Sequence, residues 1–592
     1  MPYPNLPALP QPQSRPSRPP SRPGLFSALA GHFPAGYPAP TGMRRPGKPV
    51  APPGGTSSTV TLPSVAVVAL NRMAFGPRPG DIAAFNALGG TDTARLTAYV
   101  DQQLSPTSIS DTDCDNRIAA ATYQTLNKTA TQLFQDHHLA DPPTWEQRIQ
   151  PALETELATW MRAVYSKRQL LESMVHFWHN HFSMYAYEFL EGPMWVQVDR
   201  DVIRANALGN FRAMLGGIAR SQSMLVYLDN FINFADSGVG YSNENFAREC
   251  LELHCLGATV SYGNTPRNLV PTDGNGVPLG YCQEDVQDLA RALTGWTFDI
   301  DYIPGQAGTT GQFVYRNDLH STEAKILLGT QMASGRTAQV DGNQALDILV
   351  QHPACGKFIA KKLCRRLVGD FPPQSLVDSA AALFTSQWQA PDQLKQVVRH
   401  ILLSNEFRTT WGEKIKRPFE IAVSALRASS AELRFYYQIP YPPDYNTWHV
   451  DMMDTSGLHY LYEMGNQILF GWHPPNGHPD IRGAWQASSP RVACWRLVNW
   501  LVETQQANGT WRLNVIGQTP SGVRSANEIV DFWIDRIYGR ALSAFDRDQL
   551  VDFMASGHNA DLDLPLDTDD ATQDRLRSLV ALMFMSPEFL WR

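Results

Sequence analysis

Residues 145–182 constrain the fold of this chain more than any other segment, because their apolar side chains recur every three or four positions. That spacing gives an α-helix one apolar face, which must be buried against other elements. The segment therefore predicts one or two long amphipathic helices inside a large helical body. Its apolar positions are Leu153, Leu157, Trp160, Met161, Val164, Leu170, Leu171, Met174, Val175 and Trp178.

Three histidines lie within six residues at the end of this segment. His176 and His179 would project about 60° apart on a helix, close enough to serve one ion. His179 and His181 would project about 200° apart, so they could share a site only if the helix ended between them. Interleaved aromatic residues leave two interpretations open: a metal or acid–base site, or a hydrogen-bonded structural cluster.

A second polar phrase lies in the predicted helix over residues 243–256. Glu249 and Glu252 are three residues apart, with Arg248 beside them and His254 two residues further on. Such carboxylates can ligate a metal or act as acid and base. The alternative is a buried ion-pair network in which Arg248 neutralises one of them. The candidate metal ligands are His176, His179, His181 and His254, and the candidate catalytic residues are Arg248, Glu249 and Glu252.

The composition is that of a soluble globular protein, with 43% hydrophobic and 18% charged residues among 592. A net charge of −8 provides no field that would attract nucleic acid, so we expect no nucleic-acid partner. No apolar run is long enough to span a bilayer, which favours a soluble, cytoplasmic protein without a transmembrane segment. The basic residues Lys361, Lys362, Arg365 and Arg366 are interpreted as the solvated face of a helix.

The helical spacing of apolar residues along most of the chain predicts a mainly α fold. Residues 1–60 form a Pro-rich leader, disordered or extended as a strap, since they cannot bury enough apolar surface. Residues 61–592 are predicted to form a single large helical domain, with two lobes over 61–335 and 336–592 as an option. Alternating residues at 296–300 and 311–315 predict a small β-hairpin, and 440–490 a long aromatic and Pro-rich loop.

Several phrases follow one another along residues 65–590. They are Leu70–Pro77, Phe177–Phe182, Asn243–Glu249, Ala292–Trp296, His352–Ala354, Phe358–Leu363, Lys416–Glu420 and Leu469–Trp472. In this order they are similar to those of a bacterial family called domain of unknown function 1800. The resemblance implies a mainly helical protein without an assigned activity. Members often carry an export signal, which implies a periplasmic or exported location, although this leader lacks an apolar core. They are often encoded beside a phosphatase- or sulfatase-like protein, which implies such a partner.

The leading expectation from the sequence is a metal-dependent enzyme, hydrolytic or oxidative, with a divalent metal ion of unknown identity. Its His/Glu cluster would lie on facing helices, where bound water is activated. One alternative is a non-catalytic scaffold in which the same polar residues fix the helix register. Another is a glycan- or polymer-binding protein, suggested by the 15 Trp and 20 Tyr residues and by the aromatic loop.

Overall fold

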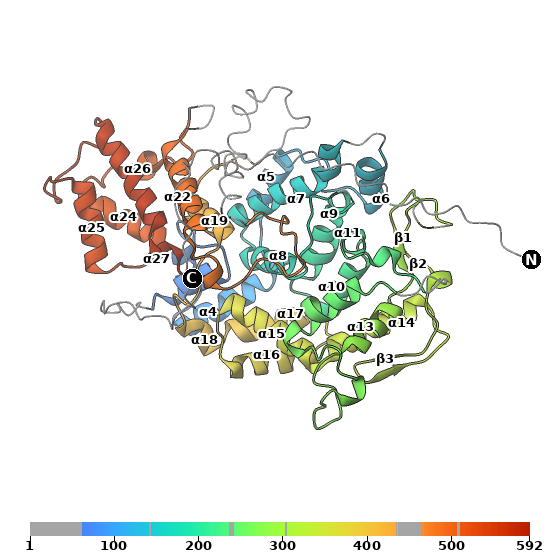
Figure 1. Cartoon of the computed structure of the whole chain (residues 1–592). Coiled ribbons are helices and arrows are strands. Elements are labelled where there is room, and N and C mark those ends of the chain that lie inside the picture. Colours follow the sequence, from blue (N-terminus) through green and yellow to red (C-terminus); the bar gives the residue numbers. More distant parts are fainter. Residues whose placement is uncertain are drawn as a thin grey trace, which may run out of the picture. The chain divides into compact units, whose positions relative to one another are not determined.

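The computed structural model describes residues 62–592, apart from 141–143, 189, 236–241, 302, 304, 434, 436–464, 466 and 506–508. All described residues belong to one compact unit that begins at Val60. The leader predicted for residues 1–60 and much of the loop predicted for 440–490 lie outside the described residues. The described part consists mainly of helices, which confirms a mainly α fold (Figure 1).

The stretch at 145–182 forms two helices. The hydroxyl of Thr144 accepts a hydrogen bond from Gln147 in a capping box that opens α7, Trp145–Tyr165. A short turn leads into α8, Gln169–His181, which carries the three histidines. The other helices before the strands are α2 (Val65–Arg72), α3 (Asp81–Asn86), α4 (Asp92–Gln103), α5 (Thr112–Ala120), α6 (Ala130–Phe134), α9 (Trp195–Gln197), α10 (Phe211–Arg220), α11 (Gln222–Tyr227) and α13 (Gln283–Ala292).

Two helices near the predicted site continue as π-helices. The segment η4, Val198–Arg204, follows α9, and η6, Cys250–Cys255, follows α12, Asn245–Glu249. In a π-helix the hydrogen bonds run from residue i to i+5, so side chains rotate away from their α-helical positions. The helix predicted over 243–256 is therefore confirmed, and its second half is a π-helix. Apolar spacing does not reveal a wider turn of this kind.

The described strands form two short antiparallel ribbons. β1, Trp296–Phe298, pairs with β2, Phe313–Tyr315, which confirms the predicted hairpin. β3, Lys325–Leu327, pairs with β4, Thr330–Met332, through the two-residue turn Leu328-Gly329. Both turn residues have positive φ, 49° and 77°, as a type I′ turn requires. This second ribbon was not predicted from the sequence.

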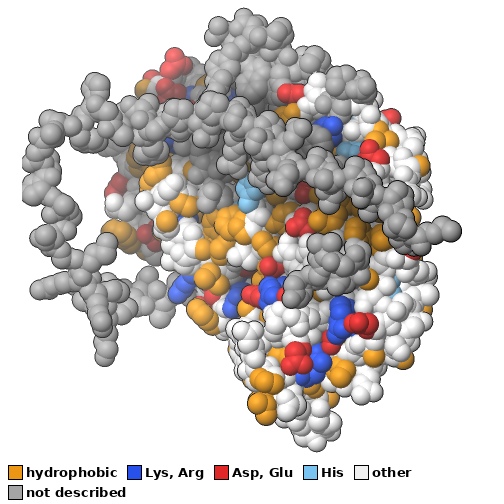
Figure 2. All heavy atoms as spheres, turned by 45° about the vertical axis from the view of Figure 1, so that its right-hand side comes forward, with side chains coloured by type: hydrophobic (Ala, Val, Ile, Leu, Met, Phe, Trp, Pro, Cys, Tyr) orange, Lys and Arg blue, Asp and Glu red, His pale blue; other side chains and the backbone are white. Residues whose placement is uncertain are grey.

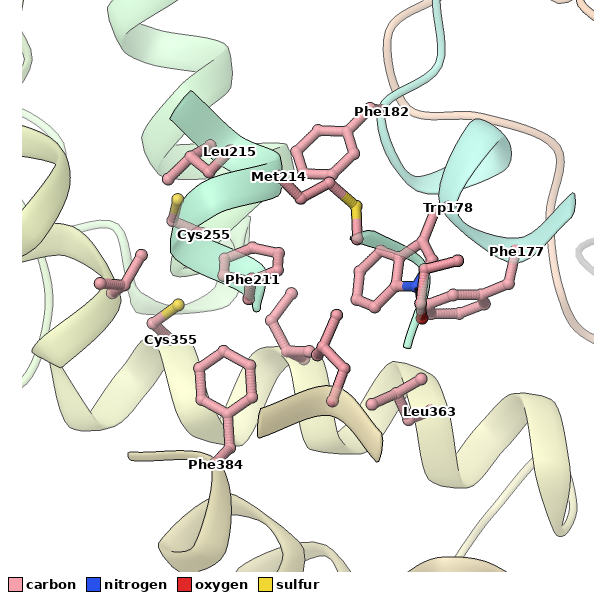
Figure 3. Packing of buried hydrophobic residues seen from close by; sticks show 14 of the residues in the cluster. Phe177, Trp178, Phe182, Phe211, Met214, Leu215, Cys255, Cys355, Leu363 and Phe384 are labelled. Atoms are coloured by element: carbon pink, nitrogen blue, oxygen red, sulfur yellow. Dashed lines mark hydrogen bonds between the residues drawn. The ribbon is translucent and has the colours of Figure 1, made fainter. Parts of the chain in front are cut away.

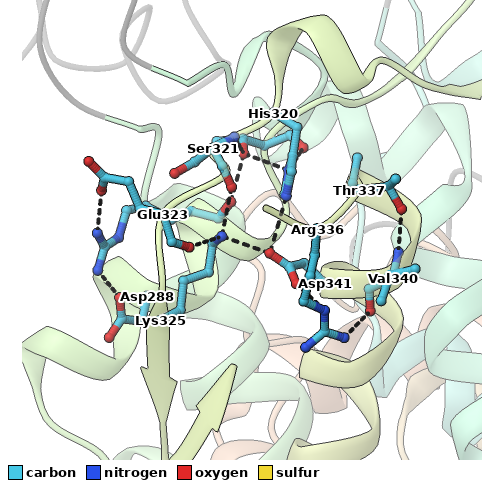
Figure 4. Close-up of polar contacts among 12 residues, drawn as sticks. Asp288, His320, Ser321, Glu323, Lys325, Arg336, Thr337, Val340 and Asp341 are labelled. Carbon is cyan, nitrogen blue, oxygen red and sulfur yellow. Dashed lines mark hydrogen bonds and ion pairs between the residues drawn. The ribbon is translucent and has the colours of Figure 1, made fainter. Parts of the chain in front are cut away.

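A buried carboxylate fastens the second ribbon to α14, Ala338–Gln351 (Figure 4). Asp341 accepts a hydrogen bond of 2.7 Å from Lys325 Nζ and lies 3.1 Å from Arg336 Nε. His320 Nε2 lies 3.2 Å from the same carboxylate. Because the charges of Asp341 are satisfied locally, this network has a structural role.

Most buried apolar side chains belong to two hydrophobic cores. In the larger core, Phe177 and Trp178 of α8 pack near Phe211 of α10 and near side chains of α15 and α16 (Figure 3). Its members run from Ala66 to Phe407, on both sides of position 335, and the division into two lobes stays a prediction. The second core surrounds Trp533.

The helices after the strands and α14 complete the described chain. None of the described helices is long and apolar enough to cross a bilayer. Helices α15 and α16 pack against each other, and α15 forms a wall of the site described below (Figure 1). The bounds are α15 (Pro353–Leu367), α16 (Gln374–Ser386), α17 (Gln393–Leu402), α18 (Asn405–Thr409), α19 (Pro418–Ala428), α22 (Ser488–Glu503), α23 (Val515–Gln518), α24 (Ala526–Tyr538), α25 (Ala544–Ala555), α26 (Asp570–Met585) and α27 (Pro587–Leu590).

Candidate functional site

His179 belongs to a buried ion-pair network with η4. Helix α8 continues through His181, so it does not end between His179 and His181. His179 Nε2 lies 2.9 Å from Asp199 Oδ1, and Arg204 Nε lies 3.4 Å from Asp199 Oδ2. Burial alone would raise the pKa of Asp199, but Arg204, His179 and Arg162 hold it below its usual range. Asp199 follows His179 by twenty residues, and no local pattern in the sequence marks it as a partner.

His176 is packed among aromatic rings on another side of α8. Its imidazole stacks on Phe419 with 5.0 Å between ring centroids and meets the edge of Phe75 at 6.2 Å. Burial lowers the pKa of His176 well below its usual value, and the charges of Arg417 and Arg366 lower it further. Its Nε2 atom is buried without a hydrogen-bond partner among the described residues.

His181 makes a defined pair with Lys362 of α15. His181 Nε2 lies 3.1 Å from the backbone carbonyl of His254 and donates to it, so Nδ1 is left as an acceptor. Lys362 Nζ lies 2.8 Å from that Nδ1 and donates to it. Burial and the charge of Lys362 lower the pKa of His181 well below its usual value, so the ring is neutral. Burial lowers the pKa of Lys362 to about 8.

His254 is fully buried on η6 and meets His181 through its backbone. The two imidazole centroids are 6.2 Å apart. Neither ring nitrogen of His254 has a hydrogen-bond partner in the part of the chain that the structure describes. Burial lowers the pKa of His254 to about 3, so the ring is neutral at physiological pH.

The predicted catalytic residues lie on α12 and η6 and are close enough for Arg248 and Glu252 to influence the charge of Glu249. Arg248 Nη2 donates to Glu244 at 2.8 Å and to Gln283 at 3.0 Å. Burial and the charge of Glu252 raise the pKa of Glu249. Glu252 alone of these predicted residues lies among the described residues that line the large cleft introduced below. The carboxylate that Arg248 binds is thus Glu244, four residues earlier in the chain.

The predicted ligands do not converge on one point. No group of three or more His, Cys, Asp or Glu side chains within the described ranges is arranged to hold a metal ion. A small cavity of about 30 Å³ beside α8 brings together unpartnered nitrogens of His176, His478, Trp195 and Gln467. Two of these are the indole and amide N–H groups, which repel a cation and suit a hydrogen-bonding guest such as water. These residues therefore do not fit a divalent metal ion, and the metal stays a prediction from the sequence.

A cleft of about 1000 Å³ lies beside the C-terminal end of α8. We call it the cation-lined cleft. It is bounded by α8, α15, residues 252–262, residues 273–279 and the loop 476–480. The charged side chains on its described walls are Lys357, Lys361, Lys362, Arg365, Arg366 and Arg417 against Glu252, Asp273 and Asp480. On the face shown in Figure 2, by contrast, basic and acidic side chains lie side by side.

Helix α15 supplies most of the positive charge in two neighbouring rows. Lys357, Lys361 and Arg365 follow at intervals of four residues and therefore share one helix face. Phe358, Lys362 and Arg366 form the adjacent row of the helix, again at intervals of four residues. The interpretation of this basic run as a solvated face was wrong for Arg366, which is only 1% exposed.

Arg366 shares one buried carboxylate with two other guanidinium groups. Glu420 pairs with Arg366, with Arg592 at 2.6 Å and with Arg417 at 3.5 Å. Burial alone would raise the pKa of Glu420, but the three guanidinium groups hold it well below its usual range. Nε and Nη2 of Arg366 have no hydrogen-bond partner among the residues described. Buried donors of this kind are costly unless something accepts from them.

Asn180 of the histidine phrase positions the loop 476–480 on the cleft. Its Nδ2 donates to the carbonyl of His478 at 2.9 Å, and its Oδ1 accepts from the His478 N–H at 2.8 Å. Gly477 has a φ of 70°, and a Cβ there would lie 2.1 Å from the carbonyl oxygen of Asn180. The same loop carries Asp480, which pairs with Lys414 at 3.0 Å. Asn180 was not predicted as a functional residue, since its partner lies 298 positions away.

Comparisons with known proteins name the family without an activity. No curated protein and no solved structure matches this chain. The model of one family, described as protein of unknown function DUF1800, matches residues 68–591. This match covers nearly all of the described chain, including α8, α15 and the loop 476–480. The chain therefore belongs to the DUF1800 family.

Proposed function

We propose that this protein binds an anionic ligand, bearing carboxylate, phosphate or sulfate groups, in the cation-lined cleft. The observation that carries this proposal is the buried guanidinium of Arg366, whose Nε and Nη2 lack a hydrogen-bond partner among the described residues. A guanidinium presents such paired donors to the two oxygens of an anion. A bound anion would thus satisfy donors that the described protein groups leave open.

The charge balance of the cleft supports the same ligand class. Six Lys and Arg side chains face three carboxylates on its described walls. Two of the six, Arg366 and Arg417, are buried, where an electrostatic attraction is weakened less by water than at the surface. The cleft therefore favours negative charge even though the chain as a whole has a net charge of −8.

Lys362 is the residue that we assign to hydrogen bonding with the bound anion. Its pKa of about 8 leaves the ammonium form in excess at neutral pH, so Nζ can donate to a carboxylate, phosphate or sulfate oxygen. The neutral Nδ1 of His181, 2.8 Å away, orients the ammonium group. His181 is thus a positioning residue in this proposal, which differs from the metal-ligand role expected from the sequence.

Titration calorimetry with sulfate, phosphate and glucuronate tests the proposal. The variant Lys361→Glu/Arg365→Glu reverses two charges on the cleft wall, and Lys167→Glu/Lys395→Glu makes the same change outside it. We expect the first variant to bind these anions at least about tenfold more weakly and the second to bind like the wild type. Equal affinity in the two variants would contradict binding in this cleft.

A further inference from the structure

We infer that the ligand of the cation-lined cleft is a linear anionic polysaccharide, a hydroxyl-rich chain carrying carboxylate or sulfate groups. This inference rests on the proposed function and specifies its ligand. The distribution of charge along and across the cleft carries it.

The cations are arranged along a line. Lys357, Lys361 and Arg365 extend over eight residues of α15, which corresponds to about 12 Å along the helix axis. A single anionic group contacts only a few donors at one point. A row of this length matches a chain that repeats its charge at intervals.

The other walls carry acceptors. Glu252 comes from η6, Asp273 from the 273–279 turn and Asp480 from the loop 476–480. Carboxylates repel the charges of any polyanion, but they accept hydrogen bonds from hydroxyl groups, which polyphosphate lacks. A ligand that combines anionic groups with hydroxyl groups satisfies both kinds of wall.

The cleft also exposes apolar side chains that suit the rings of a polysaccharide. Leu279 is 47% exposed although it lies on a strongly charged cleft. Tyr262 and Phe358 line the same cleft and are half-buried. A pyranose ring has an apolar face and a polar rim, so it can pack on such side chains while its hydroxyl groups reach the carboxylates.

Calorimetry with galacturonate oligomers of one to six units tests the inference. A sulfated disaccharide series distinguishes sulfate from carboxylate, while a neutral oligosaccharide and polyphosphate of equal charge serve as comparisons. We expect affinity to rise at least about tenfold from monomer to tetramer and polyphosphate to bind at least about tenfold more weakly than the tetramer. Lys357→Glu, at one end of the row, is expected to weaken the tetramer more than the monomer.

The outcomes separate this inference from the proposed function. Equal affinity for monomer and tetramer would overturn the polysaccharide inference and leave anion binding intact. Polyphosphate binding as tightly as the tetramer would overturn it as well, in favour of an unselective polyanion site. Binding of the neutral oligosaccharide at equal affinity would contradict both proposals, as would failure of every anion to bind.

Discussion

Lys362 donates a hydrogen bond of 2.8 Å to Nδ1 of His181, across 181 positions of sequence. The other ring nitrogen of His181 donates to the carbonyl of His254, so both the tautomer and the orientation of the ring are defined. This contact joins the histidine phrase at the end of α8 to the basic face of α15. The histidine phrase and the basic face of α15 thus meet at one cleft.

Lys362→Met should reveal the titration of Lys362 in the dependence of stability on pH. The pKa of this lysine is about 8 in the folded state and 10.5 in the unfolded chain. Between these two pH values the unfolded state therefore binds more protons. Wild-type stability relative to the variant should therefore rise through that window, by up to about 1.4 kcal/mol per pH unit. Urea unfolding at several pH values measures the difference. The exposed Lys361→Met serves as control, and a flat difference for Lys362→Met would contradict the assignment.

His179→Ala and His181→Ala should destabilise the protein independently. His179 pairs with Asp199, whereas His181 pairs with Lys362, and no hydrogen bond or ion pair between described residues joins the two networks. Each substitution should cost about 1–3 kcal/mol, and the double variant should equal their sum within about 0.5 kcal/mol. A double-mutant cycle by denaturant unfolding, with elemental analysis of each protein, measures this. Strong coupling together with joint loss of a bound metal would instead support the metal centre expected from the sequence.

Asp199→Asn should be strongly destabilising at neutral pH and less so in acid. The substitution removes the carboxylate that faces His179, Arg204 and Arg162, at an expected cost of about 3–5 kcal/mol. The depressed pKa of Asp199 stabilises the fold above its unfolded value of 3.8, and that contribution is lost as the pH falls below it. Unfolding at pH 7 and in the acid range tests this, with the exposed Asp201→Asn as control. A penalty that does not shrink in acid would show that Asp199 is not the titrating group.

Gly477→Ala should disturb the loop on the cleft. Its φ of 70° and the 2.1 Å approach to the carbonyl of Asn180 leave no room for a Cβ without movement. We expect a loss of about 2 kcal/mol in stability and weaker anion binding, because Asp480 is carried by the same loop. Gly483→Ala, where a Cβ meets nothing within 4 Å, is the matched control. Unchanged stability and affinity in Gly477→Ala would show that the loop does not depend on this contact.

Features with a local pattern could be predicted from the sequence. The apolar spacing of residues 145–182 predicted α7 and α8, and the alternation around Trp296 predicted the β1–β2 hairpin. The site depended on information that no local pattern contains. His254 is buried on the π-helix η6, and the partners of His179 and Asn180 come from distant segments.

The surroundings of the basic face of α15 could not be predicted from the sequence either. The spacing of Lys361, Lys362, Arg365 and Arg366 correctly placed them on one helix. Whether such a face meets water or lines a cleft depends on what packs beside it. Here Arg366 is buried against Glu420 of α19, a contact between residues that are far apart in the chain.

Locating selenate in crystals by its anomalous scattering tests the central claim most directly, since selenate has the charge and shape of sulfate. We predict a peak in the cation-lined cleft within hydrogen-bond distance of Arg366 Nε or Nη2 and of Lys362 Nζ. The peak should be absent from the same cleft in crystals of Lys361→Glu/Arg365→Glu. Selenate bound only outside this cleft in the wild type would contradict the account.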